Sequence, residues 1–342
     1  MALTLGPDAK LPTVVELRDQ MSVSLATLDS ALRELETQGV LTRKHGIGIF
    51  VSPTVLQRQV ALVCDSGFLR GAGQSPFWDL LLDAARERAR RGGERIELHL
   101  STARHDLGAP LQRGLARDIA DRAVDGILGV GVDEDSVGWI EAQGVPFVSV
   151  FGPSYGARAA MVNYDEKRFF EMGAAWLRER GARRVEAWAK WSLTPDGEVV
   201  RARQSQEWNE AAHGLLNDGL EFHGESVSAQ EQGFALVERC FARPRAAWPD
   251  GLLFTDDVLG HGALMALRRA GVRVGQDVLV ATHANRGSAI LMGHDEPMAL
   301  LEYDPGELIE HAFRALEALL RGETVVPSVL LAPTLREVGM PA

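Results

Sequence analysis

The chain has 342 residues, of which 46% are hydrophobic and 24% charged, proportions that are ordinary for a folded globular protein and exclude wholesale disorder. Its net charge of −11 argues against a basic surface that would bind nucleic acid over the whole molecule, so charge has to be judged domain by domain. No run of 18 uncharged apolar residues predicts a membrane span, and the N-terminus lacks the pattern of a secretory signal.

Residues 11–53 form the first unit of the predicted fold. Thr13 and Glu16 have the spacing of a capping box, which predicts that a helix begins there. Ser24 follows a short turn and is placed to cap a second helix. Two β-rich runs then flank the sequence His45-Gly46-Ile47-Gly48, which predicts a hairpin with glycines at its tip. The order helix, turn, helix, hairpin is that of a winged helix-turn-helix.

Residues 54–58 are predicted to be a short linker, and beyond them the pattern changes. Near-continuous apolar strands alternate with amphipathic helices, which indicates parallel sheets covered on both faces. The first set has strands at 59–65, 95–100, 126–132 and 146–151, with helices at 77–92 and 135–144. The second has strands at 161–165, 185–190, 251–257, 277–283 and 298–304, with a helix from Pro305 to Leu320 and a last strand near 328–333. The predicted fold class is therefore α/β, with two doubly wound parallel sheets after a small winged helix.

The two sets predict two lobes with a cleft between them. We expect the first lobe to hold residues 59–163 and 294–325, and the second to hold 164–293 and 326–342. Ligands of such sheets bind outside the carboxyl ends of the strands, which would face the cleft. The two cysteines, Cys64 and Cys240, each lie in an apolar segment, so buried thiols in a reducing cytoplasm are expected and a disulfide is not.

The N-terminal unit resembles the winged-helix domain of the gluconate-repressor (GntR) family. The resemblance rests on the LPT opening at 11–13, the Val-Ser pair before the second helix, the ALREL run at 31–35 and the G-x-G-x-F-V wing at 46–51. The family pattern has a helix of about a dozen residues before LPT, where this chain has ten residues. The resemblance therefore predicts either a start upstream or a first helix that is short or missing.

Residues 60–337 resemble the sugar-sensing domain of the lac- and galactose-repressor family, which is similar to periplasmic sugar-binding proteins. The matching segments come in the family's order: SPFW at 75–78, VDGI at 124–127, GVP at 144–146, VNYDE at 162–166, FTDDVLGHGALMALRRAG at 254–271 and PTL at 333–335. Together the two resemblances indicate an arabinose-type repressor, in which a GntR-like reader is joined to a lac-repressor-like sensor. They imply operator DNA and a small sugar as partners, and no cofactor.

The resemblance places the second helix of the unit in a DNA groove, but its chemistry is unusual. The family tends to have Arg where this chain has Leu25 and Asp29; Leu25 offers only apolar contact, and Asp29 would repel phosphate. Residues 1–53 carry five basic and six acidic side chains, a net −1, so intrinsic DNA affinity is expected to be weak. The alternative is a structural or interaction module. The predicted DNA-contacting residues are Ser24, Leu25, Thr27, Ser30, Arg43, Lys44 and His45.

A sugar site needs aromatic faces for its C–H patches and fixed polar groups for its hydroxyls. On these grounds and by resemblance, the predicted ligand-binding residues are Phe77, Trp78, Asp165, Gln204, Trp208, Asp256 and His283. Each has a structural alternative: the aromatic residues as core, and the aspartates as helix N-caps. Of Asp256 and Asp257, one should face the ligand and the other cap the next helix. Gln204 stands where the family has Arg, and His283 where it often has Asp, which indicates a ligand unlike those of the well-known sugar repressors.

Enzyme and metal motifs are weak in this sequence. Gly129 and Gly131 follow a strand but lack the full dinucleotide fingerprint, and the nine histidines and two cysteines show no HExxH or paired CxxC spacing. We therefore predict no enzyme activity. The sequence instead predicts a cytoplasmic, ligand-responsive transcriptional regulator, a repressor and a homodimer through its sensor domain, without membrane contact. The alternatives are a sensor that acts through protein–protein contacts with degenerate DNA binding, and an enzyme on the same scaffold.

Overall fold

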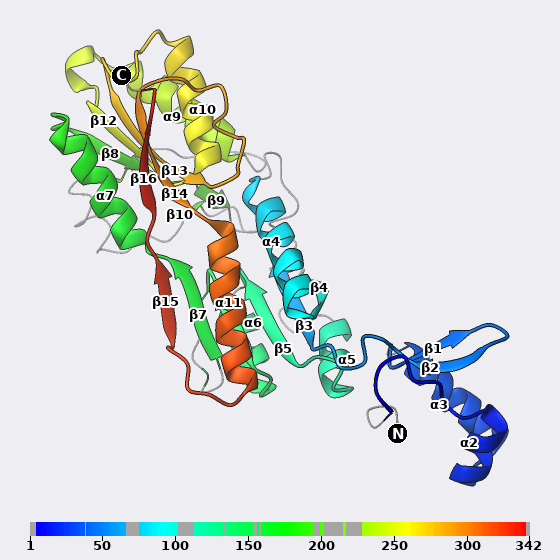
Figure 1. Cartoon of the computed structure of the whole chain (residues 1–342). Coiled ribbons are helices and arrows are strands. Elements are labelled where there is room, and N and C mark those ends of the chain that lie inside the picture. The colour runs from blue at the N-terminus through cyan, green and yellow to red at the C-terminus, as the bar shows by residue number, and fades with distance from the viewer. Residues whose placement is uncertain are drawn as a thin grey trace.

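The computed structural model describes residues 5–37, 39–65, 75–101, 113–132, 134–152, 156, 159–189, 191–193, 199–201, 215–216 and 228–339. They form three bodies in a row (Figure 1). The N-terminal module lies at one end, the first lobe in the middle, and the second lobe, with the C-terminus, at the other end. The first lobe therefore separates the N-terminal module from the second lobe in the described part of the chain.

The N-terminal module is the predicted winged helix. It contains α2 (Val14–Met21), α3 (Leu25–Thr37) and the hairpin of β1 (Leu41–Lys44) and β2 (Gly48–Val51). The capping box of Thr13 and Glu16 is present, and Ser24 Oγ accepts a bond from Thr27 N at 3.1 Å, so both predicted helix starts are confirmed. Leucines of both helices, Leu17, Leu28 and Leu32, are buried against Leu41, Ile49 and Val51 of the hairpin.

A third extended segment lies beside the hairpin, and the sequence pattern did not predict this segment. Leu11 N donates to Ile49 O at 2.8 Å, and Val51 N donates to Ala9 O at 2.8 Å. Lys10 forms an antiparallel bridge with Phe50. The residues just before the first helix of the pair therefore lie along β2 and add an extended segment to the two-stranded wing.

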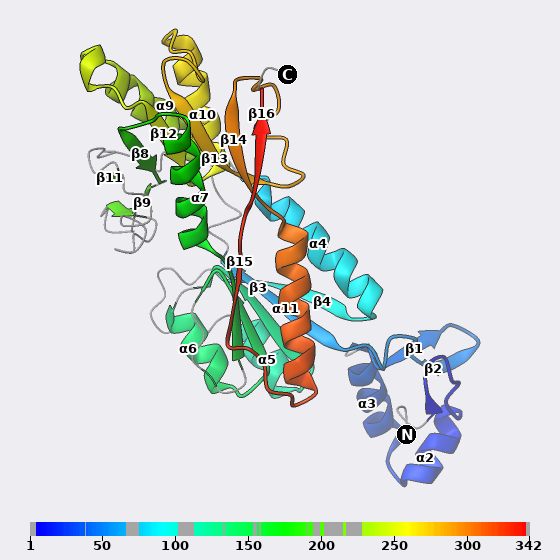
Figure 2. The same cartoon turned by 60° about the vertical axis from the view of Figure 1, so that its left-hand side comes forward.

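The first lobe is a six-stranded sheet in the order β15-β7-β6-β5-β3-β4. Its strands are β3 (Gln59–Asp65), β4 (Arg95–Ser101), β5 (Gly126–Val130), β6 (Phe147–Val150), β7 (Ala159–Tyr164) and β15 (Ser328–Leu331), all paired in parallel. Helices α4 (Phe77–Gly92) and α11 (Pro305–Leu320) cover one face, and α5 (Arg113–Ala120) and α6 (Glu134–Ala142) cover the other (Figure 2). The helix bounds predicted for 77–92 and 305–320 are confirmed.

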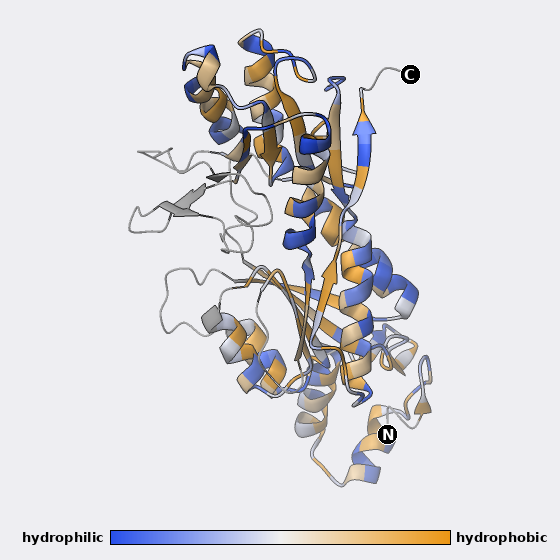
Figure 3. Cartoon of the chain, turned by 90° about the vertical axis from the view of Figure 1, so that its left-hand side faces the viewer, coloured by the Kyte–Doolittle hydropathy of each residue, from blue (hydrophilic) through white to orange (hydrophobic). Residues whose placement is uncertain are grey.

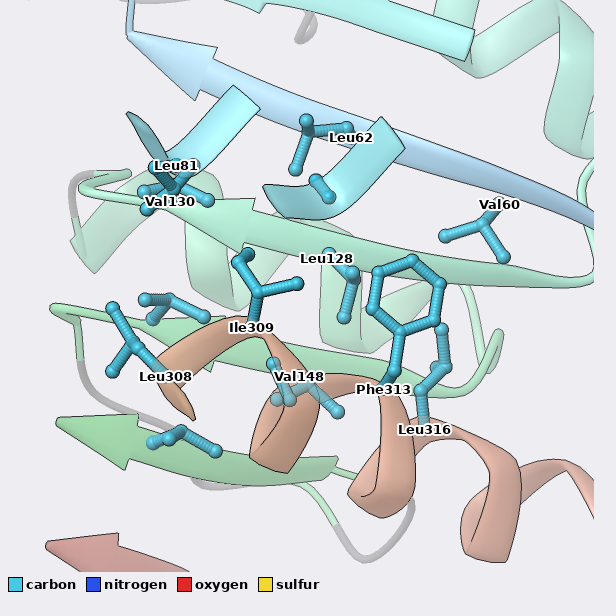
Figure 4. Close-up of a cluster of buried hydrophobic side chains, with 14 of the residues drawn as sticks. Val60, Leu62, Leu81, Leu128, Val130, Val148, Leu308, Ile309, Phe313 and Leu316 are labelled. Atoms are coloured by element: carbon cyan, nitrogen blue, oxygen red, sulfur yellow. The ribbon is translucent and has the colours of Figure 1, made fainter. Parts of the chain in front are cut away.

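Apolar side chains of α4 and α11 fill the core of this lobe (Figure 4). Leu308, Ile309, Phe313 and Leu316 of α11 point onto the strands, where Val60, Leu62, Leu128, Val130 and Val148 meet them. Leu81 of α4 is fully buried in the same cluster. Figure 3 shows the same division along the chain: strands and inward helix faces are hydrophobic, and outward helix faces are hydrophilic.

One buried charge holds the two covering helices of this lobe together. The side chain of Arg88 on α4 is only 10% exposed and pairs with Glu310 of α11 at 3.3 Å and with Glu317 of α11. Glu94, just after α4, contacts the same guanidinium at 3.3 Å. Three carboxylates from two parts of the chain thus surround a single buried arginine.

The second lobe has the sheet order β11-β8-β12-β13-β14-β16. Its strands are β8 (Val185–Trp188), β11 (Leu215–Leu216), β12 (Gly251–Phe254), β13 (Leu279–Asn285), β14 (Met298–Tyr303) and β16 (Thr334–Val338), of which β16 alone in this sheet is antiparallel to its neighbour. Helix α7 (Glu166–Glu179) covers one face, and α9 (Ala229–Phe241) and α10 (Asp257–Arg269) cover the other. A separate pair, β9 (Trp191–Leu193) with β10 (Val199–Arg201), and the short helix η2 (Arg245–Ala247) complete the elements.

The chain crosses between the lobes at three places, and two of them differ from the prediction. The first, between β7 and α7, lies at the predicted boundary near residue 164. The other two were predicted wrongly at 294 and 326: β14 pairs with β13 in the second sheet, and β15 pairs with β7 in the first. The crossings therefore fall at 303–305 and 331–334, because an apolar strand pattern does not say which of two sheets it joins.

Both cysteines are buried and neither forms a disulfide, as their apolar segments predict. Burial raises the pKa of the Cys240 thiol to about 12, so it stays protonated at neutral pH. Within the described part of the chain, no helix combines the length and apolar character that crossing a membrane requires.

Candidate functional site

The outward face of α3 carries the side chains predicted to read DNA. Ser24, Leu25, Thr27 and Ser30 are all exposed, and Leu25 is 54% exposed. Ser24 and Thr27 face each other, with 2.8 Å between their hydroxyl oxygens. Hydroxyls can donate to phosphate or base edges, whereas Leu25 can only make apolar contact. The structure thus places the four residues on one solvent-facing surface of polar and apolar character.

Carboxylates neutralise the arginines beside this surface. Asp29 of α3 pairs with Arg33 at 2.8 Å and with Arg43 of β1 at 3.6 Å. Arg43 Nε also donates to Glu36 at 2.8 Å, and that bond is the main reason the pKa of Arg43 is raised. Arg43, predicted to contact phosphate from the wing, is therefore held against the acidic side of α3.

The lysines near the wing have different surroundings from Arg43 of β1. Lys44 Nζ lies 4.7 Å from the centre of the Phe50 ring. Lys10, in the extended segment before α2, has its Nζ 6.0 Å from the centre of the same ring. Among the described residues neither lysine forms an ion pair, and His45 is exposed at the adjoining turn. Lys10, Lys44 and His45 thus form the basic part of the module, which we call the wing patch. Lys10 was missed, because only its pairing with Phe50 brings it to the wing.

A chain of aromatic rings joins the two lobes at the crossings. Phe77, at the start of α4, meets Phe151 after β6 at 5.5 Å between ring centres, and Phe151 meets Tyr164 at 4.9 Å. Tyr164, at the end of β7, stacks on Tyr303 at 3.9 Å and an interplanar angle of 12°. Tyr303 ends β14 of the second lobe and is 3% exposed. We call these four residues the interlobe aromatic cluster.

The second lobe extends this cluster with His283 and Phe169. The His283 ring lies 5.4 Å from Tyr303 and 6.3 Å from Tyr164, and Phe169 of α7 lies 6.3 Å from His283. The structure therefore brings the predicted pair Phe77 and His283 into one set. Trp78 contacts Phe77 at 5.4 Å. Trp78 is 8% exposed and Phe77 is 9% exposed, and both belong to the first-lobe core, so the burial of each also matches the structural alternative.

Sequence reasoning missed Phe151, Tyr164 and Tyr303 as members of this cluster. Phe151 has a positive φ of 58°, a strained conformation for a non-glycine residue, and its N–H donates to Asn163 Oδ1 at 2.7 Å. Burial raises the pKa of both tyrosines, which keeps their hydroxyls neutral. Tyr303 OH donates to Asp165 O at 3.0 Å, while the buried Tyr164 hydroxyl has no hydrogen-bond partner among the described residues.

The predicted aspartates begin helices in the structure. Asp165 accepts from Arg168 N at 2.9 Å as the N-cap of α7, and Asp256 accepts from Val258 N and Leu259 N, each at 3.0 Å, as the N-cap of α10. Asp257 is instead the buried member of its pair, and it accepts from Asn285 Nδ2 at 3.0 Å. Capping uses the carboxylates as structural groups, while both helix starts lie at carboxyl ends of strands. The remaining two predicted ligand residues, Gln204 and Trp208, lie outside the described residues.

A cavity of about 380 Å³ lies in the second lobe, beside β13, β14 and β16. Asp257, Asn285, His294, Glu302 and Arg336 supply its polar lining, and Met298 and Leu300 part of its apolar lining. It does not include the interlobe aromatic cluster. The cluster joins groups of both lobes, whereas the cavity belongs to one lobe.

Comparisons with known proteins match the two parts of the chain separately. A family model for bacterial regulatory proteins of the gntR family matches residues 1–51, and a model for a periplasmic binding protein-like domain matches residues 174–338. The chain thus combines a GntR-type helix-turn-helix with a periplasmic-binding-protein-like domain, as the sequence predicts.

Curated relatives are regulators. The HTH-type transcriptional regulator CelR of Thermobifida fusca is 27% identical over 231 residues, which are 63% of this chain and 63% of CelR. The uncharacterized HTH-type transcriptional regulator YurK of Bacillus subtilis (strain 168) is 38% identical over 72 residues, 21% of this chain and 30% of YurK. This chain therefore spans less than two thirds of the length of either relative.

Solved structures share the fold. A LacI-family regulatory protein from Chloroflexus aggregans has a TM-score of 0.65 at 20% identity, covering 83% of this chain and 98% of that chain. A complex of the regulator CelR with cellobiose has a TM-score of 0.62 at 22% identity, covering 96% of this chain and 94% of that chain. The fold is the two-lobed, mixed α/β architecture of these regulators, preceded by a helix-turn-helix.

Proposed function

We propose that this protein is a ligand-responsive transcriptional repressor that binds operator DNA through its winged helix and a small sugar between its lobes. The observation that carries the proposal is that the winged helix and the two lobes are directly connected. An exposed reading helix is joined by a five-residue linker, 54–58, to a lobe that shares the interlobe aromatic cluster with its partner lobe. Such a regulator acts where the DNA is, in the cytoplasm, and requires no enzymatic step.

DNA binding in this proposal depends on the wing patch more than on α3. Lys44 and His45 are exposed, and Lys10 lies beside them, so these groups can reach phosphates. Ser24, Thr27 and Ser30 contribute neutral contacts from α3, and Leu25 contributes apolar contact to a thymine methyl. Because Arg33 and Arg43 are paired with Asp29, the affinity of one module is low. Two modules in a dimer would restore it when the operator spacing fits.

The dimer is proposed to form through the sensor. Strand β4 is an edge strand of the first sheet, and its Leu98 and Leu100 are 46% and 37% exposed. An exposed apolar edge normally marks an interaction surface. It lies in the lobe that carries the reader, so a second copy bound there would set the distance between two winged helices.

The effector is proposed to be a small sugar bound at the interlobe aromatic cluster, with polar contacts from groups at the adjoining strand ends. Aromatic rings pack against sugar C–H groups, and the buried Tyr164 hydroxyl offers a neutral hydrogen-bonding group. The CelR complex with cellobiose makes that disaccharide the first candidate. A sugar that binds one arrangement of the lobes more tightly shifts the population toward it and changes the spacing of the readers.

A DNA-binding titration tests the proposal. Fluorescence anisotropy with the DNA upstream of the protein's own gene should give saturable binding that weakens as salt rises, and shuffled DNA should bind more weakly. Lys44→Ala and Lys10→Ala should each weaken binding and lower the salt dependence by about one ion. Equal or absent binding to both DNAs would contradict the proposal. NMR of the same protein with candidate sugars is expected to show no turnover.

A second function is favoured by one observation on the reading helix. Leu25 is exposed, and the arginines near it are paired with carboxylates, which suits a protein-contacting surface as well as a DNA-contacting one. In that case the protein is a sugar sensor that acts through protein contacts. It would bind the sugar but not the upstream DNA. It would also bind a partner protein, and Leu25→Arg would abolish that binding.

A further inference from the structure

Three potential metal ligands meet on the outer side of the first lobe. Glu97 and His99 are two residues apart on β4, so both point to the same face of the sheet, the face that α5 covers. Asp118 reaches them from α5. One donor atom of each side chain lies within 4.8 Å of the others. The cluster lies far along the sheet from the interlobe crossings and shares no residue with the sites described above.

His99 lacks the partners that a buried imidazole normally has. It is 6% exposed, and its buried Nε2 atom has no hydrogen-bond partner among the described residues. The nearest acidic atom, Asp118 Oδ2, lies 3.8 Å away, beyond hydrogen-bonding distance. A buried polar atom without a partner destabilises the folded state, and a metal ion would supply that partner, so Nε2 is placed as a ligand atom would be.

In the part of the chain that the structure describes, the carboxylates of the cluster have no cationic side chain paired with them. Among the described residues, neither Glu97 nor Asp118 pairs with a lysine or arginine; the nearby Arg117 is occupied by Asp121 at 3.4 Å. Glu97 instead accepts a hydrogen bond from Gln59 Nε2 at 3.2 Å. The cluster thus contains two carboxylates and an imidazole, and no described lysine or arginine is paired with them. A divalent ion would balance the two negative charges.

Distances and donor types indicate the class of ion. A tetrahedral Zn²⁺ site with bonds of about 2.0–2.1 Å separates its ligand atoms by about 3.3 Å. The 3.8 Å between His99 and Asp118 is close to that separation, and the Glu97 carboxylate lies within 4.8 Å of both. One nitrogen and two oxygen donors suit a borderline transition-metal ion such as Zn²⁺ better than Mg²⁺ or Ca²⁺, which prefer oxygen alone.

We propose that Glu97, His99 and Asp118 form a binding site for one zinc-class divalent ion, with water as the fourth ligand. Gln59 orients Glu97 from outside the ligand set. Gln59 is also the first residue of β3, directly after the linker, and the backbone N of Arg95 at the start of β4 donates to Arg58 O at 2.8 Å. A bound ion would therefore fasten α5 and β4 to the end of the linker that carries the reader.

Zinc binding by the whole, tag-free protein tests the site. The protein is stripped with a chelator, dialysed, and titrated with Zn²⁺ by calorimetry, then with Co²⁺ to record the visible absorption of a tetrahedral site. We expect one ion per chain and a higher melting temperature when it is bound. His99→Gln and Asp118→Asn should each lower the Zn²⁺ affinity at least about 100-fold, and Gln59→Ala about 10-fold. His311→Gln changes a partly buried histidine that also faces a glutamate, and should leave the affinity unchanged.

Two results would overturn the site. One is the absence of binding by the wild-type chain, with no heat and no cobalt absorption at micromolar to millimolar metal. The other is binding that survives both His99→Gln and Asp118→Asn; loss of it in His261→Gln would assign the ion to the His261–His294 pair of the second lobe, whose ring nitrogens are 2.9 Å apart. Asp118 is only partly buried, so the variant at that position tests the site even where the His99 variant unfolds.

Discussion

Two arginines, Arg43 in the N-terminal module and Arg88 in the first lobe, have similar partners but different surroundings. Arg43 contacts Asp29 and Glu36, and its side chain is 43% exposed. Arg88 contacts Glu94, Glu310 and Glu317, and its side chain is 10% exposed. Both join a helix to a neighbouring element through carboxylates.

The difference in burial decides what each cluster does. Exposed ion pairs contribute about 0–1 kcal/mol and are screened by salt, so the Arg43 cluster can open when a phosphate competes for the guanidinium. A buried cluster is costly to break, because the remaining charges stay desolvated. The same kind of ion pair thus leaves Arg43 of the N-terminal module able to exchange partners, whereas Arg88 holds α4 and α11 of the first lobe together.

The largest effect is expected at the buried cluster. Arg88→Ala leaves Glu94, Glu310 and Glu317 without their shared cation and should lower the free energy of unfolding by about 3–5 kcal/mol. Urea unfolding of the whole chain measures it. Arg86→Ala is the matched control on the same helix, because Arg86 is 81% exposed and pairs only with Asp83 in the described residues; it should cost less than about 0.5 kcal/mol. Equal losses in the two variants would show that burial does not separate the clusters.

A smaller effect is expected at the exposed cluster, on DNA affinity. Asp29→Asn removes a negative charge, releases Arg33, and leaves Arg43 held by Glu36 alone, so binding to upstream DNA should tighten by about 10-fold at low salt, with a salt slope steeper by about 1. Anisotropy titrations at several salt concentrations measure both quantities. Asp19→Asn releases Arg18 on α2 and serves as the control for charge alone. If both variants tighten binding alike, the Arg43 cluster has no special role.

The smallest effect is expected at two matching helix caps. Thr13 with Glu16 in the reader and Ser228 with Glu231 in the second lobe form capping boxes of the same design. Thr13→Ala and Ser228→Ala should each cost about 1 kcal/mol in the transition of their own body. Differential scanning calorimetry resolves where each loss falls; a loss in the other body's transition would mean that the two unfold as one unit.

The same caps predict a dependence on pH. Hydrogen bonds from the backbone and side chain of Thr13 and of Ser228 lower the pKa of Glu16 and Glu231 from 4.5. A carboxyl whose pKa is lowered on folding stabilises the folded state above its unfolded pKa, and that contribution is lost as pH falls through its folded pKa. The destabilisation by Thr13→Ala and Ser228→Ala should therefore shrink when melting is repeated from pH 7 down to pH 3. A constant difference over that range would contradict the role of the glutamates.

Local signals in the sequence were sufficient for most elements. Apolar periodicity predicted the bounds of α4 and α11, and the glycines at 46 and 48 predicted the hairpin. The assignment of β14 and β15 to lobes failed, because strand pairing depends on contacts distant in sequence. The same reason explains why Tyr303 and Phe151 were missed: their place in the aromatic cluster comes from crossings that no local pattern encodes.

The predicted site residues divide in the same way. Phe77 and His283 were predicted from their place near strands and in the family's order, and the structure puts Phe77 at the start of α4 and His283 within β13, both near the lobe junction. Whether an aspartate at such an end caps a helix or faces a ligand depends on backbone geometry, and Asp165 and Asp256 both cap. The ion pairs of Arg43 were not predicted, since Glu36 lies seven residues away on a different element.

The central claim is that one chain couples an interlobe sugar site to a DNA reader. The most direct test is the dissociation constant for upstream DNA, measured by anisotropy at fixed salt with and without saturating cellobiose, and then with a panel of other sugars. We predict that at least one sugar changes this constant by about 5-fold or more, and that Tyr164→Ala abolishes the change while leaving sugar-free DNA binding intact. Sequence-specific DNA binding that no bound sugar alters would contradict the coupling.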